Sequence, residues 1–447
     1  MEEIQTIECG IDSRHFGNPM PWIGVYITAA SLVCSLAVAV DISNGLRLRK
    51  LWFPCRFFSL NPTSLTLLAI ATKLPVDLTT SMPEARDQLT KLSGTVLICT
   101  AMANFMPSLG TMEDSQVILN VVPLGILVIT IIVNVCIEMV TGVIYAFRLE
   151  HKIILFFLLI MLLILCSSAL TVSTTSQLLK QQCELKHHQA SDGPDVQVET
   201  STVTKLKNDV RKYWMMAHSS SPQYVLSRSL IGTASGAFCL LGAIVLTEAF
   251  IASLYHPSTV LLCQRLIYPS TSPPGVIAIQ SPSDYQWSTR LVLFSQVIAV
   301  WVGTIAPACR WFAAVNSRGF QIKTWSEFKG KFKVERYWIQ KLVEWKDSPL
   351  HFHIKSRSCR RFVYGFRNLI LDVCLKMQTA IVLFSKSVRL TSMLAMTGLK
   401  MHVSCFLSIL VRGQFKSSGS ASNEETGSSS NTETCLNDFV LHLEGEE

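Results

Sequence analysis

Charged residues are scarce in this chain. Asp, Glu, Lys and Arg make up 16% of its 447 residues, whereas a soluble globular protein typically carries about 25%. The charge is also unevenly placed, because residues 316–416 hold nineteen Lys and Arg against five acids, and residues 417–447 hold seven acids and no Lys or Arg. With 49% apolar residues, this balance argues against a soluble globular domain and fits a chain with much of its length in lipid.

Sequence signatures of enzymes and metal sites are also missing. The chain contains no P-loop, HExxH, GxSxG or dinucleotide-binding fingerprint. Its fourteen cysteines include no CxxC pair and no Cys/His run with zinc spacing, and its paired histidines stand in loops without acidic or Cys partners. We therefore predict no catalytic, cofactor-binding or metal-binding residue and no cofactor, and we expect a protein that is not an enzyme.

The first twenty residues lack the positive region of a secretory signal peptide, because they are acidic rather than basic. We expect the first apolar run, Trp22–Val40, to insert without cleavage, with the short segment 1–21 outside.

The longest apolar run is Ile153–Val172, twenty residues without a charge. A helix of this length covers the roughly 30 Å hydrocarbon core of a bilayer. Fourteen of its residues are Leu, Ile, Phe or Val, and together they favour insertion by at most about 4 to 8 kcal/mol. This run predicts a transmembrane helix.

Six further runs complete a predicted all-α polytopic helical membrane protein with about seven transmembrane helices. Five of them are strong: Trp22–Val40, Leu92–Leu109, Val117–Tyr145, Leu230–Leu254 and Leu291–Cys309. The sixth, Leu60–Leu78, is weak, because Lys73 and Asp77 offset its apolar residues and Pro62 and Pro75 disfavour a straight helix. A re-entrant or interfacial segment is the alternative for 60–78.

Basic residues indicate the sidedness of these spans. If 60–78 crosses and the N-terminus is outside, most Lys and Arg fall on the cytosolic side, as the positive-inside rule requires. The predicted order is spans 1–5 over 22–172, a polar cytosolic loop over 173–229, spans 6 and 7 over 230–309 around the outer loop 255–290, a basic cytosolic or interfacial helical region over 310–416, and an acidic disordered tail over 417–447.

The basic region 310–416 carries apolar residues at helical spacing among its Lys and Arg. Trp338, Trp345, Phe362 and Phe366 are its candidate interfacial anchors, since amphipathic helices of this kind lie in the plane of the interface. A small cytosolic helical bundle is the alternative. We expect the lipid bilayer as partner, with anionic headgroups and protein partners at the cytosolic face and no nucleic acid, because no nucleic-acid module accompanies the charge.

Polar residues inside the spans are the other candidate functional residues. They are Lys73, Asp77, Asn104, Asn134, Glu138 and Glu248. Asn134 and Glu138 share one helical face, and Lys73 and Asp77 are spaced to neutralise each other. One interpretation is a polar path formed by Asn104, Asn134, Glu138 and Glu248. The other is that these residues form hydrogen bonds between helices or lie near headgroups.

Four strings resemble a plant family of uncharacterised multi-pass integral membrane proteins. They are KLWFPCRFFSLNPTSLTLLAIATKLPVDLTTSMP (Lys50–Pro83), KYWMMAHSSSPQYVLSRS (Lys212–Ser229), VGTIAPACRWFAAVN (Val302–Asn316) and FKVERYWIQKLVEWKDSPL (Phe332–Leu350). The resemblance runs from about Pro21 to about Val411. It implies a plant source and a membrane location, and it brings no activity or catalytic residues. The sequence leaves the organelle open between plasma membrane and endomembrane.

Two functions follow from these observations. The first is a non-enzymatic integral membrane protein whose basic cytosolic face binds anionic lipid or protein partners. The second is a transporter or channel for a small solute or ion, against which stands the lack of a detectable inverted repeat.

Overall fold

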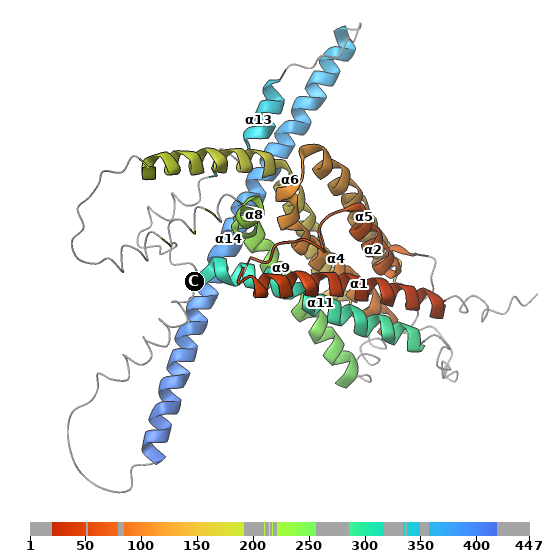
Figure 1. Ribbon diagram of the computed structural model, residues 1–447. Coiled ribbons are helices and arrows are strands. Elements are labelled where there is room, and N and C mark those ends of the chain that lie inside the picture. Colours follow the sequence, from red (N-terminus) through yellow and green to blue (C-terminus); the bar gives the residue numbers. More distant parts are fainter. Residues whose placement is uncertain are drawn as a thin grey trace, which may run out of the picture. The chain divides into compact units, whose positions relative to one another are not determined.

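The computed structural model describes residues 20–50, 52–78, 85–191, 210, 214, 217, 221–255, 286–316, 334–335, 338–348 and 357–417. Every regular element in this part of the chain is a helix (Figure 1), which confirms the predicted all-α polytopic fold. The chain divides into two units, 1–393 and 394–447. The described part of the second unit is the end of one long helix.

Seven of the described helices contain segments long and apolar enough to cross a bilayer. They are α1 (Met20–Arg47), α4 (Ala85–Phe105) continued by the 3-10 helix η2 (Met106–Thr111), α5 (Asp114–Val140), α6 (Arg148–Ser191), α9 (Leu230–Tyr255), α11 (Gln286–Asn316) and α14 (Arg357–Ser417). The shorter helices are α2 (Pro62–Ala71), α3 (Lys73–Val76), α8 (Pro222–Arg228) and α13 (Gln340–Asp347). The protein is therefore a multi-pass integral membrane protein.

The spans α1, α4, α5, α6, α9 and α11 run between two ends of one bundle. At the first, which we call the Lys91 end, Lys91 of α4 pairs with Glu138 of α5, and Ser288 of α11 donates to Pro21 of α1. At the second, the Arg310 end, Arg310 of α11 donates to the Ala103 carbonyl of α4 at 3.4 Å. Successive helices join these ends in alternating directions, as expected for a chain that threads a bilayer.

The segment 60–78 forms α2 and α3 instead of one continuous span. The first helix begins at a capping box in which Asn61 and Ser64 satisfy each other's backbone N–H, with Pro62 at the first helical position. Pro75 has no N–H to donate to the carbonyl of Ala71, and that carbonyl accepts the Gln296 amide of α11 at 2.8 Å instead. At ten residues, α2 reaches about 15 Å and is too short to cross alone.

Together, however, α2 and α3 pass from one end of the bundle to the other. The Leu60 N–H donates to Ser108 near the Arg310 end at 3.1 Å, and the Val76 carbonyl accepts from Asn134, one turn before Glu138. The weak predicted span is thus replaced by a broken crossing, whose free carbonyls are satisfied by neighbouring helices as the membrane interior requires.

The central helix of the bundle is α4. All residues from Asp87 to Phe105 are buried, and the helix packs against α11, α9 and α6. In contrast, α1, α5, α9 and α11 leave large apolar side chains exposed, among them Leu36, Leu119, Leu241 and Ile298. An apolar exterior around a buried polar helix is the pattern expected of a protein whose solvent is lipid.

Two helices differ from the sequence-based expectation. The predicted polar loop 173–229 begins as helix, because α6 continues through Ser191. Its polar extension is rich in Leu, Gln, Lys and Glu, which are good helix formers. The segment Arg361–Gly398 of α14 satisfies the length and hydropathy of a span, whereas the sequence predicts a cytosolic or interfacial helical region over 310–416.

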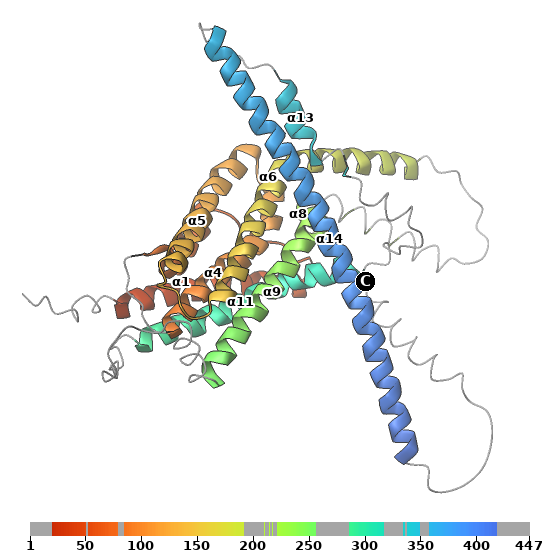
Figure 2. The same cartoon turned by 180° about the vertical axis from the view of Figure 1, so that it is seen from behind.

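The part of α14 in the first unit runs across the direction of α11 and α9 (Figures 1 and 2). Its contacts reach residues toward the Arg310 end of the spans: Gln378 donates to the Ser167 carbonyl, Arg389 donates to the Ala314 carbonyl, and Ser392 accepts from Trp311. These contacts extend from Gln378 to Ser392 of α14, about 21 Å of helix, and their partners share one end of the bundle.

Candidate functional site

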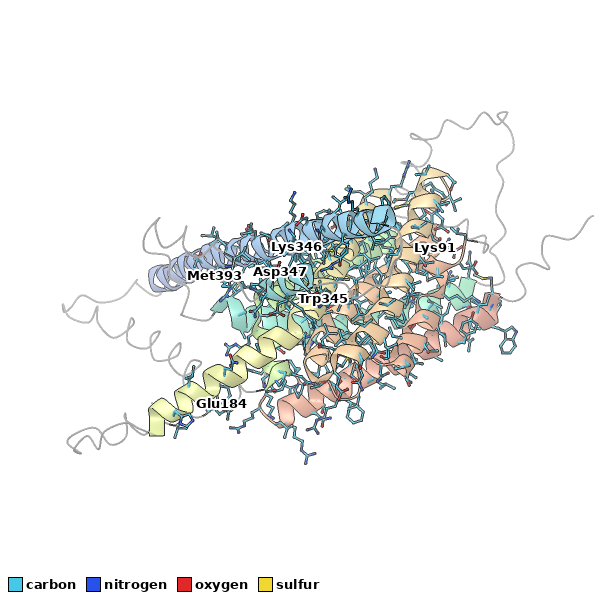
Figure 3. All side chains as sticks on the ribbon, turned by 90° about the horizontal axis from the view of Figure 1, so that it is seen from above. Lys91, Glu184, Trp345, Lys346, Asp347 and Met393 are labelled. Atoms are coloured by element: carbon cyan, nitrogen blue, oxygen red, sulfur yellow. The ribbon has the colours of Figure 1, made fainter. Side chains whose placement is uncertain are left out.

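A buried ion pair between Lys91 and Glu138 marks one end of the bundle. The ammonium of Lys91 donates to Oε1 of Glu138, and their side chains are 2% and 5% exposed. Figure 3 places Lys91 among the packed helices. Removing both ions from water is costly, so a pair of this kind persists only where the partners neutralise each other closely.

The surroundings of this pair are also buried and polar. Gln88 accepts the backbone N–H groups of Tyr145 and Ala146, and His151 contacts the Phe147 carbonyl through Nδ1 at 2.8 Å. Within the described residues, Oε2 of Glu138 and Nε2 of His151 have no hydrogen-bond partner. The cluster organises the turn between α5 and α6 and keeps two acceptor atoms unused.

The predicted intramembrane polar residues do not form one path. Asn134 donates to the Val76 carbonyl, and Asn104 donates to the Gly303 carbonyl of α11 at 2.7 Å. Glu248 is exposed on α9, away from these contacts. The hydrogen-bond interpretation therefore describes Asn104 and Asn134, because each amide satisfies a backbone carbonyl between helices.

The Lys73 and Asp77 side chains occupy the broken crossing. The ammonium of Lys73 lies over the Tyr26 ring, 5.4 Å from its centroid, which is a cation–π contact. The backbone N–H of Asp77 donates to the Lys73 carbonyl at the end of α3.

Sequence reasoning missed three buried polar residues that fix the bundle. Lys91 lies just before the predicted span Leu92–Leu109, yet α4 buries it. Gln296 of α11 donates to Ala71 of α2 and accepts from Ser93 of α4, and Asp41 accepts the N–H groups of residues 56–58. Only Pro75 gave a signal, because a proline inside an apolar helix frees a carbonyl that some neighbour must satisfy.

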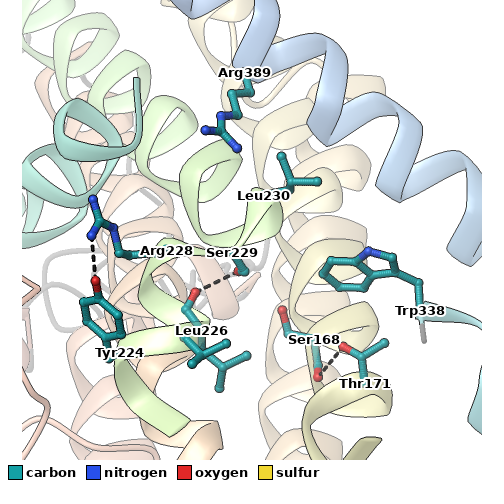
Figure 4. Close-up of a pocket in the computed structure, with 10 residues that line it drawn as sticks. Ser168, Thr171, Tyr224, Leu226, Arg228, Ser229, Leu230, Trp338 and Arg389 are labelled. Atoms are coloured by element: carbon teal, nitrogen blue, oxygen red, sulfur yellow. Dashed lines mark hydrogen bonds between the residues drawn. The ribbon is translucent and has the colours of Figure 1, made fainter. Parts of the chain in front are cut away.

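A pocket of about 330 Å³ lies at the Arg310 end (Figure 4). It is formed where α6, α8 and the start of α9 meet α14 and the Trp338 segment. Its lining combines two guanidinium groups, hydroxyl groups and apolar side chains, from Ser168, Thr171, Tyr224, Val225, Leu226, Arg228, Ser229, Leu230, Trp338 and Arg389. No Asp or Glu is among these ten described lining residues.

The two arginines are held by neighbouring groups. Arg228 donates to the Tyr224 hydroxyl at 2.6 Å and lies over the same ring. Arg389 reaches the pocket from α14 and donates to the Ala314 carbonyl at 3.3 Å. Both guanidinium groups belong to the lining of one pocket, so an anion placed between them would be favoured.

The predicted interfacial anchors divide into buried and exposed residues. Trp338 is not the exposed interfacial anchor that the sequence predicts. It is only 6% exposed and belongs to the main hydrophobic core, because its ring packs inward while Nε1 donates to Glu335. Trp345 is 43% exposed on α13. Phe362 and Phe366 stack on each other on α14 and are 73% and 56% exposed, as anchors would be.

Ion pairs join α13 and the preceding segment to α14. Lys346 contacts Asp372 at 2.7 Å, and Lys386 contacts Glu335 at 2.8 Å. Figure 3 shows Trp345 and Lys346 where α13 runs along α14. These two ion pairs hold α13 and Glu335 beside α14. The second pair engages the carboxylate of Glu335, the acid that precedes Trp338.

No protein-family model, curated protein or solved structure matches this chain. The resemblance to a plant membrane-protein family remains a prediction.

Proposed function

We propose that this multi-pass membrane protein is non-enzymatic. Its Arg310 end, with the basic region 316–416, lies on the cytosolic side and binds anionic lipids of the adjacent leaflet. The exposed stripe of α14 carries this proposal. Phe362, Phe366, Leu369, Ile370, Val373 and Met377 recur at helical spacing and are all exposed.

The buried face of α14 is mixed, because Gln378, Ser385 and Lys386 are buried alongside Leu371 and Val382. Its exposed stripe, in contrast, is apolar, which is unusual for a helix surrounded by water. The same stripe continues to Phe384, which stacks on Phe238 of α9. Phe238 lies eight residues inside that span, about 12 Å from its start, which supports a stripe at the depth of the membrane layer.

Basic residues accompany this stripe. Arg361 and Lys376 are exposed on the same helix, and the region 316–416 carries a net charge of +14. A basic residue near an anionic leaflet contributes about 1 kcal/mol. An apolar stripe with cationic neighbours fits a helix that lies in the interface, apolar side down.

A photocrosslinking experiment tests this proposal. The full chain is reconstituted in nanodiscs with p-benzoylphenylalanine at Phe366 or, as the matched control, at Asn368, which is exposed on a different side of α14. We expect lipid adducts from position 366, more in anionic than in neutral nanodiscs, and few from position 368. Equal adducts from both positions, or adducts indifferent to lipid charge, would contradict the proposal.

Transport of a small solute or ion is a second candidate, favoured by the polar residues of the fully buried α4 and by the unused acceptors beside Lys91. Flux across vesicles reconstituted with the full chain tests it, with Glu138→Gln as the variant. Equal flux with and without protein, over a panel of ions and solutes, would remove this candidate.

A further inference from the structure

We infer that the pocket between Arg228 and Arg389 binds the phosphate of an anionic lipid headgroup. This inference deepens the proposed function and rests on it, because it identifies a single bound lipid at the end of the bundle that faces the anionic leaflet.

The charge of the pocket favours an anion. Two guanidinium groups on different helices, α8 and α14, line one pocket, and none of its described lining residues is acidic. The nearest acid in the preceding segment, Glu335, is held by Lys386 at 2.8 Å and by Nε1 of Trp338 at 3.2 Å. Arginine presents a planar fork of donors that matches phosphate oxygens, and an anion there relieves the repulsion between the two cations.

The rest of the lining adds hydroxyl groups to the two arginines. Ser168 and Thr171 of α6 and Ser229, just before α9, border the same space (Figure 4), and in this structure they donate to Met106 Sδ, the Ser168 carbonyl and the Leu226 carbonyl. The volume, about 330 Å³, is near the lower end of the range for small-molecule sites, about 300–1,000 Å³. A headgroup phosphate is therefore more suitable than a larger ligand.

The position of the pocket favours a lipid over free phosphate. Leu230 lines it and is also the first residue of a spanning helix, so the pocket lies at the level where apolar span begins. Leu226, Val225 and Trp338 add apolar surface beside the arginines. A phospholipid presents this combination, with phosphate at the interface and acyl chains directly below it.

The test uses the purified full chain in a neutral detergent and a short-chain fluorescent phosphatidic acid, followed by fluorescence polarisation. Arg228→Gln with Arg389→Gln should weaken binding at least about tenfold, the effect of losing 1.4 kcal/mol. Arg86→Gln with Arg290→Gln removes the same charge from exposed positions toward the Lys91 end, outside the pocket and outside the α14 stripe, and it should change binding less than threefold.

Competition distinguishes the possible sources of the phosphate. Unlabelled phosphatidic acid should displace the probe, whereas inorganic phosphate at the same concentration should not. Displacement by inorganic phosphate at the same concentration, or equal losses in the two double variants, would overturn the inference. If the pocket variant does not fold, Arg228→Gln alone, at an exposed position, still has to weaken binding.

Failure of this inference is distinct from failure of the proposed function. Lipid adducts at Phe366 with unchanged phosphatidic acid binding in the arginine variant would retain the lipid-facing helix and reject the pocket. Arginine-dependent binding of phosphatidic acid without lipid adducts at Phe366 would retain the pocket and reject the lipid-facing helix.

Discussion

Lys91 and Glu138 are paired inside the bundle, with side chains 2% and 5% exposed. One partner comes from the first turns of α4 and the other from the last turns of α5, so the pair connects the central helix to its neighbour at one end. Because neither charge reaches water, each depends on the other for its stability in the interior.

Removing one member of this pair should therefore destabilise the protein more than removing both. We expect Lys91→Met or Glu138→Met to lower the free energy of unfolding by about 3–5 kcal/mol, since each leaves an unpaired buried charge. The double variant should recover most of that loss. Thermal unfolding in detergent measures all three, and a double variant with the summed loss of the single variants would contradict this account.

Gln296 and Pro75 should be energetically coupled. Gln296→Leu leaves the Ala71 carbonyl without its 2.8 Å donor and should cost about 1–3 kcal/mol. In the background of Pro75→Ala, residue 75 regains an N–H that can donate to the same carbonyl, so the loss caused by Gln296→Leu should shrink. A double-mutant cycle measures the coupling, and strictly additive effects would refute the explanation of the broken crossing.

Gly236 and Gly365 should respond in opposite ways to alanine. A Cβ at Gly236 would lie 2.4 Å from the Pro307 carbonyl oxygen, whereas a Cβ at Gly365 meets nothing within 4 Å. Gly236→Ala should therefore push α9 from α11 and destabilise the fold, by about 1–3 kcal/mol. Gly365→Ala should stabilise by about 0.5–1 kcal/mol, the helix-propensity difference. The unfolding temperatures of the two variants and of the unmodified chain measure this difference. Equal shifts of the unfolding temperature in the two variants would contradict the prediction.

The Cys55 thiol should react slowly at neutral pH. Burial raises its pKa from 9.0 to about 11, with Asp41 adding to the rise and Arg310 opposing it. Alkylation of the folded chain should accelerate about tenfold per pH unit between pH 8 and the folded pKa, because only the thiolate reacts. Mass spectrometry of the peptide containing Cys55 follows the rate, with the unfolded chain as control.

The same shift predicts the sign of an effect on stability. Since the folded pKa exceeds the unfolded value of 9.0, the folded state retains the proton longer. The stabilising contribution is present below pH 9 and is lost as pH rises toward 11. Cys55→Ser should reduce this alkaline loss of stability, and an unchanged pH profile would contradict the assignment.

The apolar runs were sufficient to predict the long helices, because a helix that crosses a bilayer must be long enough and apolar enough to match the hydrocarbon core. Ile153–Val172 and Leu230–Leu254 lie inside α6 and α9. The end of α6 could not be predicted in the same way, since its polar continuation lacks the apolar signal that identifies spans.

The candidate sites depended on tertiary pairing, which the sequence does not contain. Lys91 looked like a loop residue because its neutralising partner is 47 residues away. Trp338 looked like an exposed anchor because it lies among basic residues, yet the core covers it. Arg228 and Arg389 are 161 positions apart, and only the packing of α14 on the start of α9 places both in one pocket.

The most direct test of the central claim is a density map of the full chain in nanodiscs that contain phosphatidic acid. We predict a lipid phosphate within hydrogen-bonding distance of both Arg228 and Arg389, with Phe362 and Phe366 in the acyl-chain region beside it. An empty pocket in such nanodiscs, with the α14 stripe in water, would contradict the account.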